Sequence, residues 1–344
     1  MWQVVGHQSA VSLLARGLKN KSLAHAYLLV GPPKIGKMTI AINLSQGVNC
    51  LANLVDRPCG ECNQCFRITQ GLHADVQVVD VQRDATEDTS RKLIRLEQIQ
   101  DIHHSATLKP FEGRYRVFII REASLLSEEA ANALLKLLEE PPDSVLMVLL
   151  TSNPDLLPDT IISRCQQLNL NPLPSDVISR ELQNLPGILP IDAMEMAKLS
   201  RGSIGWAIEA VTTPSLMEDH KSNMQFIGAL LESCLEDRFA YAEEIDRLFR
   251  RDRNLALNKL TAFLNWWRDL LVLKSGCQDL IVNTAAIEDL LDHSKWLSTT
   301  QIVTAIKDTL RTISHLHSNI NTRLAIEVLM IRLPYQNKSP NNED

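Results

Sequence analysis

The feature that most constrains the fold of this chain is a glycine-rich loop between a short apolar strand and a helix. Residues 26–30 read Ala-Tyr-Leu-Leu-Val, the loop runs from Gly31 to Lys37, and residues 38–48 have a helical pattern. In this context the glycines let backbone N–H groups turn toward a phosphate, and the lysine adds positive charge. The sequence therefore predicts a phosphate-binding loop, with Gly31, Gly36 and Lys37 as the candidate nucleotide contacts.

The first half of the chain continues this alternation of strands and helices. Apolar runs at 76–79, 117–120 and 145–150 are separated by segments with helical spacing of apolar residues. Such runs indicate a parallel sheet covered on both faces, and right-handed crossovers make it doubly wound. After about residue 170 the pattern is helical. We expect an α/β domain at 1–170, a small helical domain at 171–213, an all-α domain at 214–334 and a disordered polar tail at 335–344.

Composition narrows the function classes. The chain has 344 residues, enough for two or three domains, and a net charge of −6, so the molecule as a whole does not attract DNA. Residues 1–8 lack the pattern of an export signal, and the most apolar run, 145–150, is far too short to span a bilayer. We expect a cytoplasmic protein with no membrane contact.

Four of the seven cysteines are grouped as Cys50-x8-Cys59-x2-Cys62-x2-Cys65. An odd total with one tight cluster favours a metal site and free thiols over a disulfide framework. Four thiolates fill the tetrahedral shell of Zn²⁺ and leave no open position for chemistry. The sequence predicts a structural zinc site in an insertion at about 50–65; the other interpretation is four reduced thiols in a surface insertion.

Two positions that a working ATP site needs are changed in this chain. A Ser or Thr that holds Mg²⁺ normally follows the loop lysine, but Met38 stands there, and a soft, neutral thioether does not replace oxygen. Thr39 is rotated by about 100° along the helix and does not substitute. The strand at 117–120 is followed by Arg121-Glu122 where an Asp and a Glu would act on the metal and the water. We expect no ATP hydrolysis by the chain itself, weak or no ATP binding, and a solvated Glu122.

With these motifs in view, the chain resembles bacterial DNA polymerase III clamp-loader subunits of the AAA+ class. The resemblance covers nearly the whole chain. It rests on the strand that enters the loop, the position of the cysteine insertion and three further segments, which are Asn132–Pro142, the Ser-Arg-Cys motif at Ser163–Cys165 and Asn321–Leu333. It implies a RecA-like P-loop domain, a helical lid and a C-terminal collar that joins subunits in a ring.

The resemblance also implies a role for Arg164, the arginine of Ser-Arg-Cys. In this family that arginine projects across an interface toward the ATP of a neighbouring motor subunit, and such fingers stabilise transition-state charge. The lid segment Gly202–Ala207 lacks the arginine with which motor subunits sense nucleotide. The pattern is typical of a non-catalytic subunit in a hetero-pentamer with gamma/tau and delta subunits, which acts on the sliding clamp and primer-template DNA.

Two other functions are compatible with the residues alone. One is a divergent gamma/tau-type motor subunit that hydrolyses ATP with unusual Mg²⁺ ligation. The other is a zinc-stabilised interaction protein unconnected with replication. For Arg164 itself, the alternative to a finger is an ordinary surface salt bridge.

Overall fold

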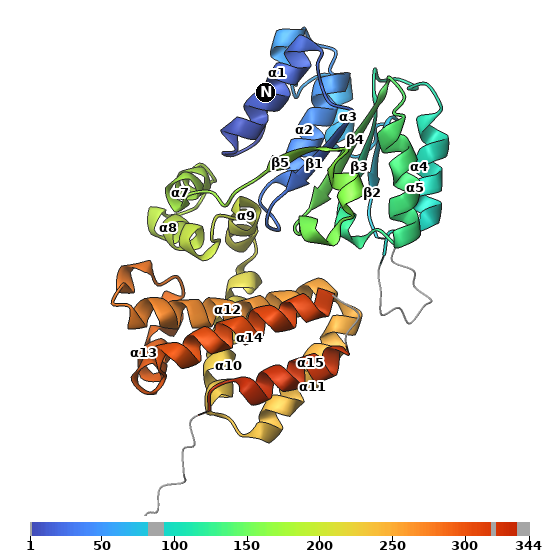
Figure 1. Cartoon of the computed structure of the whole chain (residues 1–344). Coiled ribbons are helices and arrows are strands. Elements are labelled where there is room, and N and C mark those ends of the chain that lie inside the picture. The colour runs from blue at the N-terminus through green and yellow to red at the C-terminus, as the bar shows by residue number, and fades with distance from the viewer. Residues whose placement is uncertain (1, 82–92, 318–320, 336–344) are drawn as a thin grey trace, which may run out of the picture. The chain divides into compact units, whose positions relative to one another are not determined.

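The computed structural model describes residues 2–81, 93–317 and 321–335, and the chain divides into two compact units, Met1–Val211 and Thr212–Asp344 (Figure 1). Residues 336–344 of the predicted tail lie outside the described residues. The three separate domains predicted at 1–170, 171–213 and 214–334 stay a prediction.

The first unit is built on a five-stranded sheet in which every pairing is parallel. The strand order is β2-β3-β4-β1-β5, so the chain adds strands first on one side of β1 and then on the other, as in doubly wound sheets. This confirms the predicted α/β class. The strands are β1 (Ala26–Val30), β2 (Val76–Val79), β3 (Arg116–Ile120), β4 (Val145–Thr151) and β5 (Gln166–Asn169).

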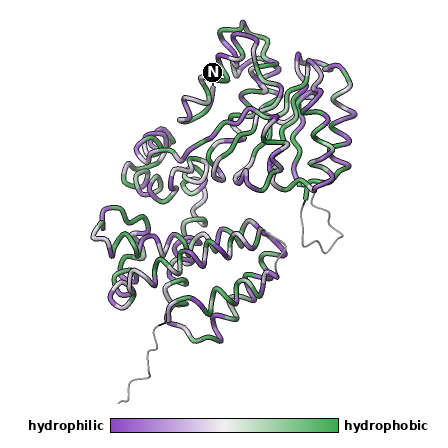
Figure 2. The backbone as a smooth tube through the Cα atoms, in the orientation of Figure 1, coloured by the Kyte–Doolittle hydropathy of each residue, from purple (hydrophilic) through white to green (hydrophobic). Residues whose placement is uncertain are grey.

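Helices cover both faces of this sheet (Figure 1). Alternate strand residues point to opposite faces, so Leu29 and Val148 pack in one core while Leu28 and Met147 pack in the other. The central strands β1, β3 and β4 are consequently apolar over most of their length, consistent with the hydropathy colouring of the backbone (Figure 2). The first core packs against α1 (Gln8–Asn20) and α2 (Lys37–Asn49), and the second against α4 (Leu96–Ala106) and α5 (Glu128–Glu139).

Asp75 anchors the loop that leads into β3. Its side chain is fully buried and accepts hydrogen bonds from the backbone N–H groups of Phe111, Glu112 and Gly113 at 2.7, 2.8 and 2.7 Å. The guanidinium of Arg116 lies 3.3 Å from the same carboxylate. Burial alone would raise the pKa of Asp75, but these donors outweigh it and hold the pKa below its ordinary value.

We expect Asp75→Asn to lower the free energy of unfolding by about 2–3 kcal/mol at pH 7, because three buried N–H donors lose a charged acceptor. The folded-state pKa of Asp75 is depressed, so its contribution is complete above the unfolded pKa of about 3.9 and is lost as the pH falls through the folded value. Urea unfolding at a series of pH values measures this. The difference from wild type should be constant above about pH 5 and shrink below about pH 4; a pH-independent difference would contradict the assignment.

Shorter helical elements complete the described part of the first unit. Those before β5 include α3 (Asn63–Thr69), the 3₁₀ turn Leu54–Asp56 and α6 (Asp159–Ile162), and those after it are α7 (Ser175–Gln183), α8 (Pro190–Leu199) and α9 (Ile204–Thr212). Further 3₁₀ turns lie at Ala123–Leu125 and Pro154–Leu156.

The second unit is all-α in its described part. Trp266 and Trp267 are fully buried in its hydrophobic core. Its helices are α10 (Pro214–Glu232), α11 (Leu235–Arg251), α12 (Arg253–Lys274), α13 (Ile287–Trp296), α14 (Thr299–His317) and α15 (Thr322–Arg332), with 3₁₀ turns at Gln278–Leu280 and Thr284–Ala286. Among the described residues, no helix is long and apolar enough to cross a membrane.

Arg238 near the start of α11 is the main polar group in the core of the second unit. It is only 1% exposed, and its guanidinium donates five hydrogen bonds to backbone carbonyls. The acceptors lie at the carboxyl ends of α10 and α15 and in the residues that follow. They are Leu230, Leu231, Met330, Leu333 and Pro334, at 2.9–3.2 Å. One side chain thus satisfies the last carbonyls of two helices and lies in the negative field of both helix ends.

Candidate functional site

The glycine-rich loop follows the carboxyl end of β1, where ligands bind in open α/β sheets. Gly31 donates its N–H to Thr151 O at 3.2 Å, which ties the start of the loop to the end of β4. A side chain at Gly31 would meet Leu170 O at 2.6 Å, and Gly36 has a φ of 111°, so both positions require glycine. The structure therefore places Gly31, Gly36 and Lys37 together in one loop between β1 and α2.

Lys37 is engaged by its own chain. Its side chain is buried, and Nζ donates to Gly31 O at 2.5 Å, Pro32 O at 2.9 Å and Ser152 Oγ at 3.0 Å. These three acceptors use all three protons of the ammonium group. Burial lowers the pKa of Lys37, and the nearby carboxylate of Glu122 opposes that effect. A phosphate at this loop would have to replace contacts that the lysine already makes.

The position after the lysine does not offer a metal ligand. Met38 packs against the apolar core formed by α1, α2 and the sheet, while the side chain of Thr39 is exposed. That neither residue supplies the oxygen that Mg²⁺ requires at the start of α2 stays a prediction.

The residues after β3 also depart from a metal site. Arg121 Nη1 lies 2.9 Å from Asp80 Oδ2, in an ion pair that is about half exposed. Glu122 is only partly exposed, and burial raises its pKa while the charge of Lys37 lowers it. The prediction of a solvated Glu122 was therefore wrong, because this carboxylate lies close enough to Lys37 to interact with its charge. Asp80, at the end of β2, is a site residue that the sequence patterns did not single out.

The start of α9 contacts the glycine-rich loop directly. Gly205 N donates to Lys34 O at 2.8 Å, Ser203 Oγ donates to Pro33 O at 3.1 Å, and the side chains of Lys34 and Glu209 form an ion pair. A side chain at Gly205 would meet Lys34 O at 2.7 Å. The segment that lacks an arginine is thus bound to the loop by its backbone.

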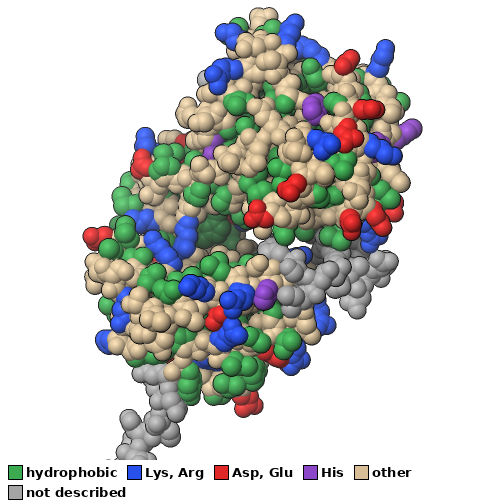
Figure 3. All heavy atoms as spheres, viewed as in Figure 1, with side chains coloured by type: hydrophobic (Ala, Val, Ile, Leu, Met, Phe, Trp, Pro, Cys, Tyr) green, Lys and Arg blue, Asp and Glu red, His purple; other side chains and the backbone are tan. Residues whose placement is uncertain are grey.

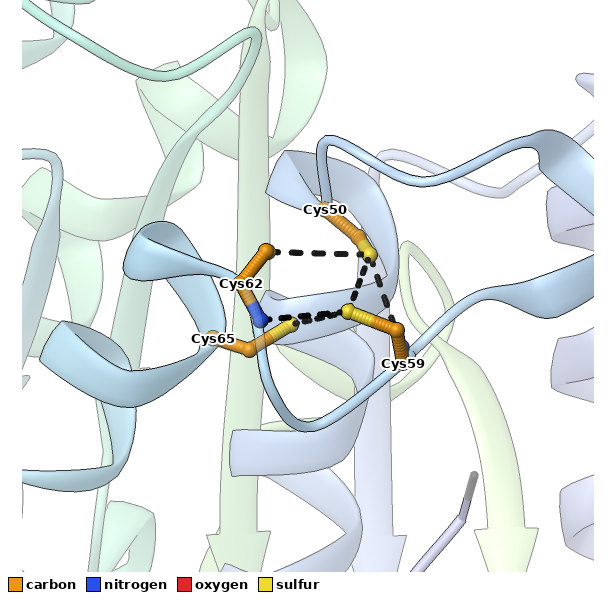
Figure 4. A group of neighbouring side chains, drawn as sticks. All are labelled: Cys50, Cys59, Cys62 and Cys65. Carbon is orange, nitrogen blue, oxygen red and sulfur yellow. Dashed lines mark hydrogen bonds between the residues drawn. The ribbon is translucent and has the colours of Figure 1, made fainter.

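The four clustered cysteines form one group between α2 and α3. Their side chains point toward one another (Figure 4), and their sulfur atoms all lie within 4.8 Å of one another. The sulfur atoms of Cys50 and Cys59 lie 3.4 Å apart, those of Cys59 and Cys65 3.9 Å, and those of Cys50 and Cys62 4.0 Å. A tetrahedral Zn²⁺ with Zn–S bonds of about 2.3 Å separates its sulfurs by about 3.8 Å. The cluster can therefore hold a metal ion of this kind.

Backbone donors support the sulfurs. Cys59 N donates to Cys50 Sγ and Cys62 N donates to Cys59 Sγ, both at 3.4 Å. The bond from Cys62 is the main reason why the pKa of Cys59 falls to about 6. Burial raises the pKa of Cys50 and of Cys65. A divalent cation would supply the charge that lets all four thiols deprotonate together.

Arg164 follows α6 and its side chain is partly exposed. Nη2 lies 2.8 Å from Glu139 Oε1 at the end of α5, and Nη1 donates to Thr160 O at 2.9 Å. Ser163 Oγ is 3.5 Å from Nη1, at the limit of a hydrogen bond. The partner Glu139 belongs to the segment Asn132–Pro142, but no sequence pattern indicated this pair.

The strand register separates Arg164 from the glycine-rich loop of its own chain. Gln166 pairs with Tyr27 and Asn169 pairs with Val30, so Arg164 lies before the amino end of β5. The loop begins at Gly31, beyond the carboxyl end of the neighbouring β1. At about 3.3 Å per residue, five or six strand positions correspond to about 16–20 Å. The guanidinium of Arg164 therefore lies near the amino ends of the strands, whereas the glycine-rich loop of the same chain lies at their carboxyl ends.

Comparisons with known proteins identify the family. The profile described as "DNA polymerase III, delta subunit" matches residues 6–174. The DNA polymerase III gamma subunit of Buchnera aphidicola (strain APS) is 30% identical over 78% of this chain and 74% of its own length. The delta' subunit of Bacillus subtilis is 28% identical over 94% of both chains. The tau/gamma subunit of Haemophilus influenzae is 36% identical over 69% of this chain.

The chain spans 34–42% of the length of the tau and tau/gamma relatives from Haemophilus influenzae, Escherichia coli and Salmonella typhimurium. A solved structure of a gamma-subunit-related protein from Thermotoga maritima covers 93% of this chain and 97% of its own, at 17% identity and a TM-score of 0.37. Family membership excludes an interaction protein unrelated to replication. The chain belongs to the AAA+ family of DNA polymerase III clamp-loader subunits.

Proposed function

We propose that this chain is a delta-prime-type clamp-loader subunit that does not hydrolyse ATP itself and supplies Arg164 to the ATP site of a neighbouring motor subunit. The proposal rests on the residues that occupy the two Mg²⁺-binding positions near the glycine-rich loop. Met38 packs in the core and Arg121 is paired with Asp80, so both positions that would hold Mg²⁺ lack a ligand oxygen. On this proposal the glycine-rich loop has kept its phosphate-binding shape but has lost the residues that would bind Mg²⁺.

The position of Arg164 supports a role between subunits. Arg164 lies near the amino ends of the strands, away from the glycine-rich loop of its own chain. Its side chain is partly exposed, so a neighbouring subunit can reach it. Its ion pair with Glu139 is at the surface, where such pairs stabilise by about 0.2–1 kcal/mol. The charge of a bound γ-phosphate can compete with so weak a contact, and the pair holds the guanidinium in place until the subunits meet.

The proposed assembly is a hetero-pentamer with gamma/tau and delta subunits, joined through the collar helices of residues 214–334. In it, ATP bound by motor subunits organises the ring that opens the sliding clamp and places it on primer-template DNA. This chain would act through the complex. The first unit would comprise the AAA+ domain at 1–170 and the lid at 171–213.

Reconstitution tests the proposal. Motor and delta-type subunits are purified, combined with or without this chain, and assayed for assembly by gel filtration and for DNA-stimulated ATP hydrolysis. We expect a stable complex only when this chain is present, with an ATPase rate well above that of the motor subunits alone. A full DNA-stimulated rate without this chain would overturn the proposal.

We also propose that the cysteine cluster binds a structural Zn²⁺ through Cys50, Cys59, Cys62 and Cys65. The ion would hold the loop between α2 and α3 in its folded shape, because the cluster has no open position for a substrate. Metal analysis should find about one zinc per chain. The double change Cys62→Ser and Cys65→Ser should remove it and lower the thermal unfolding midpoint.

The control for the zinc prediction changes two cysteines outside the cluster. Cys234 and Cys277 are exposed, so Cys234→Ser with Cys277→Ser should retain the metal and the unfolding midpoint. A chain that contains no zinc, or whose cluster variant keeps it, would contradict the assignment.

A second candidate function has one observation in its favour. The tau/gamma subunit of Haemophilus influenzae is 36% identical to this chain, whereas the delta' subunit of Bacillus subtilis is 28% identical, although the delta' match spans 94% of both chains. The alternative is therefore a divergent motor subunit with unusual Mg²⁺ ligation. The two functions differ in whether the isolated chain hydrolyses ATP.

A further inference from the structure

A cavity of about 680 Å³ lies at the amino ends of the strands, away from the glycine-rich loop. Leu18 near the end of α1, His25 before β1 and Val145 at the start of β4 contribute to its wall. Because the strands are parallel, their amino ends all lie at the end of the sheet where the cavity is, whereas the glycine-rich loop follows the carboxyl end of β1. The volume is within the range of about 300–1,000 Å³ that is usual for ligand pockets. The cavity is separate from the glycine-rich loop, but it adjoins the cysteine insertion, which contributes Leu54 and Arg57 to its lining, and Arg164 lies at the same end of the strands.

Positive charge dominates the polar part of the cavity. Lys21, Arg57 and Arg114 line it, and Asp143 is the single acidic lining residue. Within the described ranges, none of the three cations forms an ion pair. Arg57 Nε donates to Ala52 O at 2.8 Å, which fixes the side chain and leaves its terminal nitrogens free for other acceptors. An anionic group in the cavity would find several donors.

His25 supplies a second, independent observation. His25 lines the same cavity, and its Nε2 is buried without a hydrogen-bond partner in the part of the chain that the structure describes. Buried polar side-chain atoms without a partner are uncommon in folded proteins and require an explanation. A polar group of a bound ligand would provide the missing partner.

The remaining lining residues are apolar, and they limit the kind of anionic ligand that the cavity can bind. Leu23, Val48 and Leu146 line the cavity together with Leu54 and Tyr115. Nucleic-acid backbones bind to cations on open surfaces, whereas this site is concave and combines few cations with an apolar lining. Acidic and basic side chains are also interspersed on the visible face of the first unit (Figure 3). The chemistry therefore fits an acidic peptide that carries an apolar side chain.

We propose that this cavity binds an acidic segment of a partner protein, with carboxylates at Lys21, Arg57 and Arg114 and an apolar side chain against Leu23 and Val48. The site is independent of the proposed role of Arg164. It would give the clamp-loader subunit a docking site for an acidic tail or loop, at the end of the sheet away from nucleotide.

Fluorescence anisotropy with the full chain tests the proposal. The probe is the fluorescein-labelled peptide Glu-Asp-Glu-Asp-Leu-Phe, and a second peptide has glycine in place of its leucine and phenylalanine. We expect saturable binding of the first peptide, at least about tenfold weaker binding of the second, and a similar loss for the first peptide with Lys21→Glu plus Arg114→Glu. Both substituted side chains are exposed, so the variant should fold.

The matched control is Lys19→Glu plus Lys109→Glu, which changes the net charge equally at exposed positions outside the cavity. It should bind the first peptide within about twofold of wild type. Leu54→Ser should weaken the first peptide and leave the second unchanged. Equal losses in both double variants, no binding of the first peptide, or stronger binding of a single-stranded oligonucleotide through Lys21 and Arg114 would overturn the proposal.

Discussion

Replacing Arg164 by alanine should reduce ATP hydrolysis at the site beside this chain by about 10³-fold or more, because an arginine finger that stabilises transition-state charge contributes about 10³–10⁵ in rate. The test uses a reconstituted complex in which the corresponding arginine of the motor subunits is replaced, so that the interface with this chain is the single active one. The DNA-stimulated ATPase rate is then measured for wild type and Arg164→Ala.

Two further variants define what Arg164 does. Arg164→Lys keeps the charge but loses the planar fork, so its rate should fall between those of wild type and alanine. Arg180→Ala removes an exposed arginine that pairs with Asp176 on α7, and it should leave the rate unchanged. Gel filtration confirms that each complex assembles. An assembled Arg164→Ala complex with the wild-type rate would show that the pair with Glu139 is merely a surface salt bridge.

Replacing Arg238 by methionine should lower the free energy of unfolding of the second unit by about 3–5 kcal/mol, because removing one partner of a buried charged network leaves its acceptors unsatisfied. Five carbonyls at the ends of α10 and α15 would lose their donor in a site that is closed to water. Burial also lowers the pKa of Arg238, which reflects the desolvation that these carbonyls offset.

Urea unfolding followed by tryptophan fluorescence measures the effect of Arg238→Met, since Trp266 and Trp267 are buried in the second unit. The control is Arg250→Met on the same helix, whose exposed guanidinium pairs with Asp246 and should contribute less than about 1 kcal/mol. An equally small effect of both substitutions would contradict the structural role of Arg238.

Sequence patterns predicted the elements that are apolar and local. The strands at 26–30, 76–79, 117–120 and 145–150 lie where the sequence placed them. Three of them, at 26–30, 117–120 and 145–150, are central in the sheet, and a strand covered on both faces must be apolar. The fifth strand was missed. It reads Gln-Gln-Leu-Asn at the edge of the sheet, where three of its four side chains are exposed. A short polar edge strand has the composition of a loop.

Sequence patterns predicted the features of the candidate site that depend on residues close together in the chain. They missed the contacts between residues that are far apart in it. The spacing of the glycines, Lys37 and the cysteines is local, so the sequence contains it. The contact of Gly205 with Lys34 joins residues 171 positions apart, and the five bonds of Arg238 depend on how three helices meet. Glu122 was misinterpreted for the same reason, because its burial and its interaction with Lys37 depend on contacts between residues far apart in the chain.

The central claim is that the loop kept its phosphate-binding shape but lost the oxygen ligands for magnesium. Its most direct test is steady-state ATP hydrolysis by the purified, isolated full chain with and without Mg²⁺, compared with Lys37→Ala. We predict no Mg²⁺-dependent turnover above that of the Lys37→Ala protein. Rapid Mg²⁺-dependent hydrolysis that Lys37→Ala abolishes would contradict the claim and favour a motor subunit.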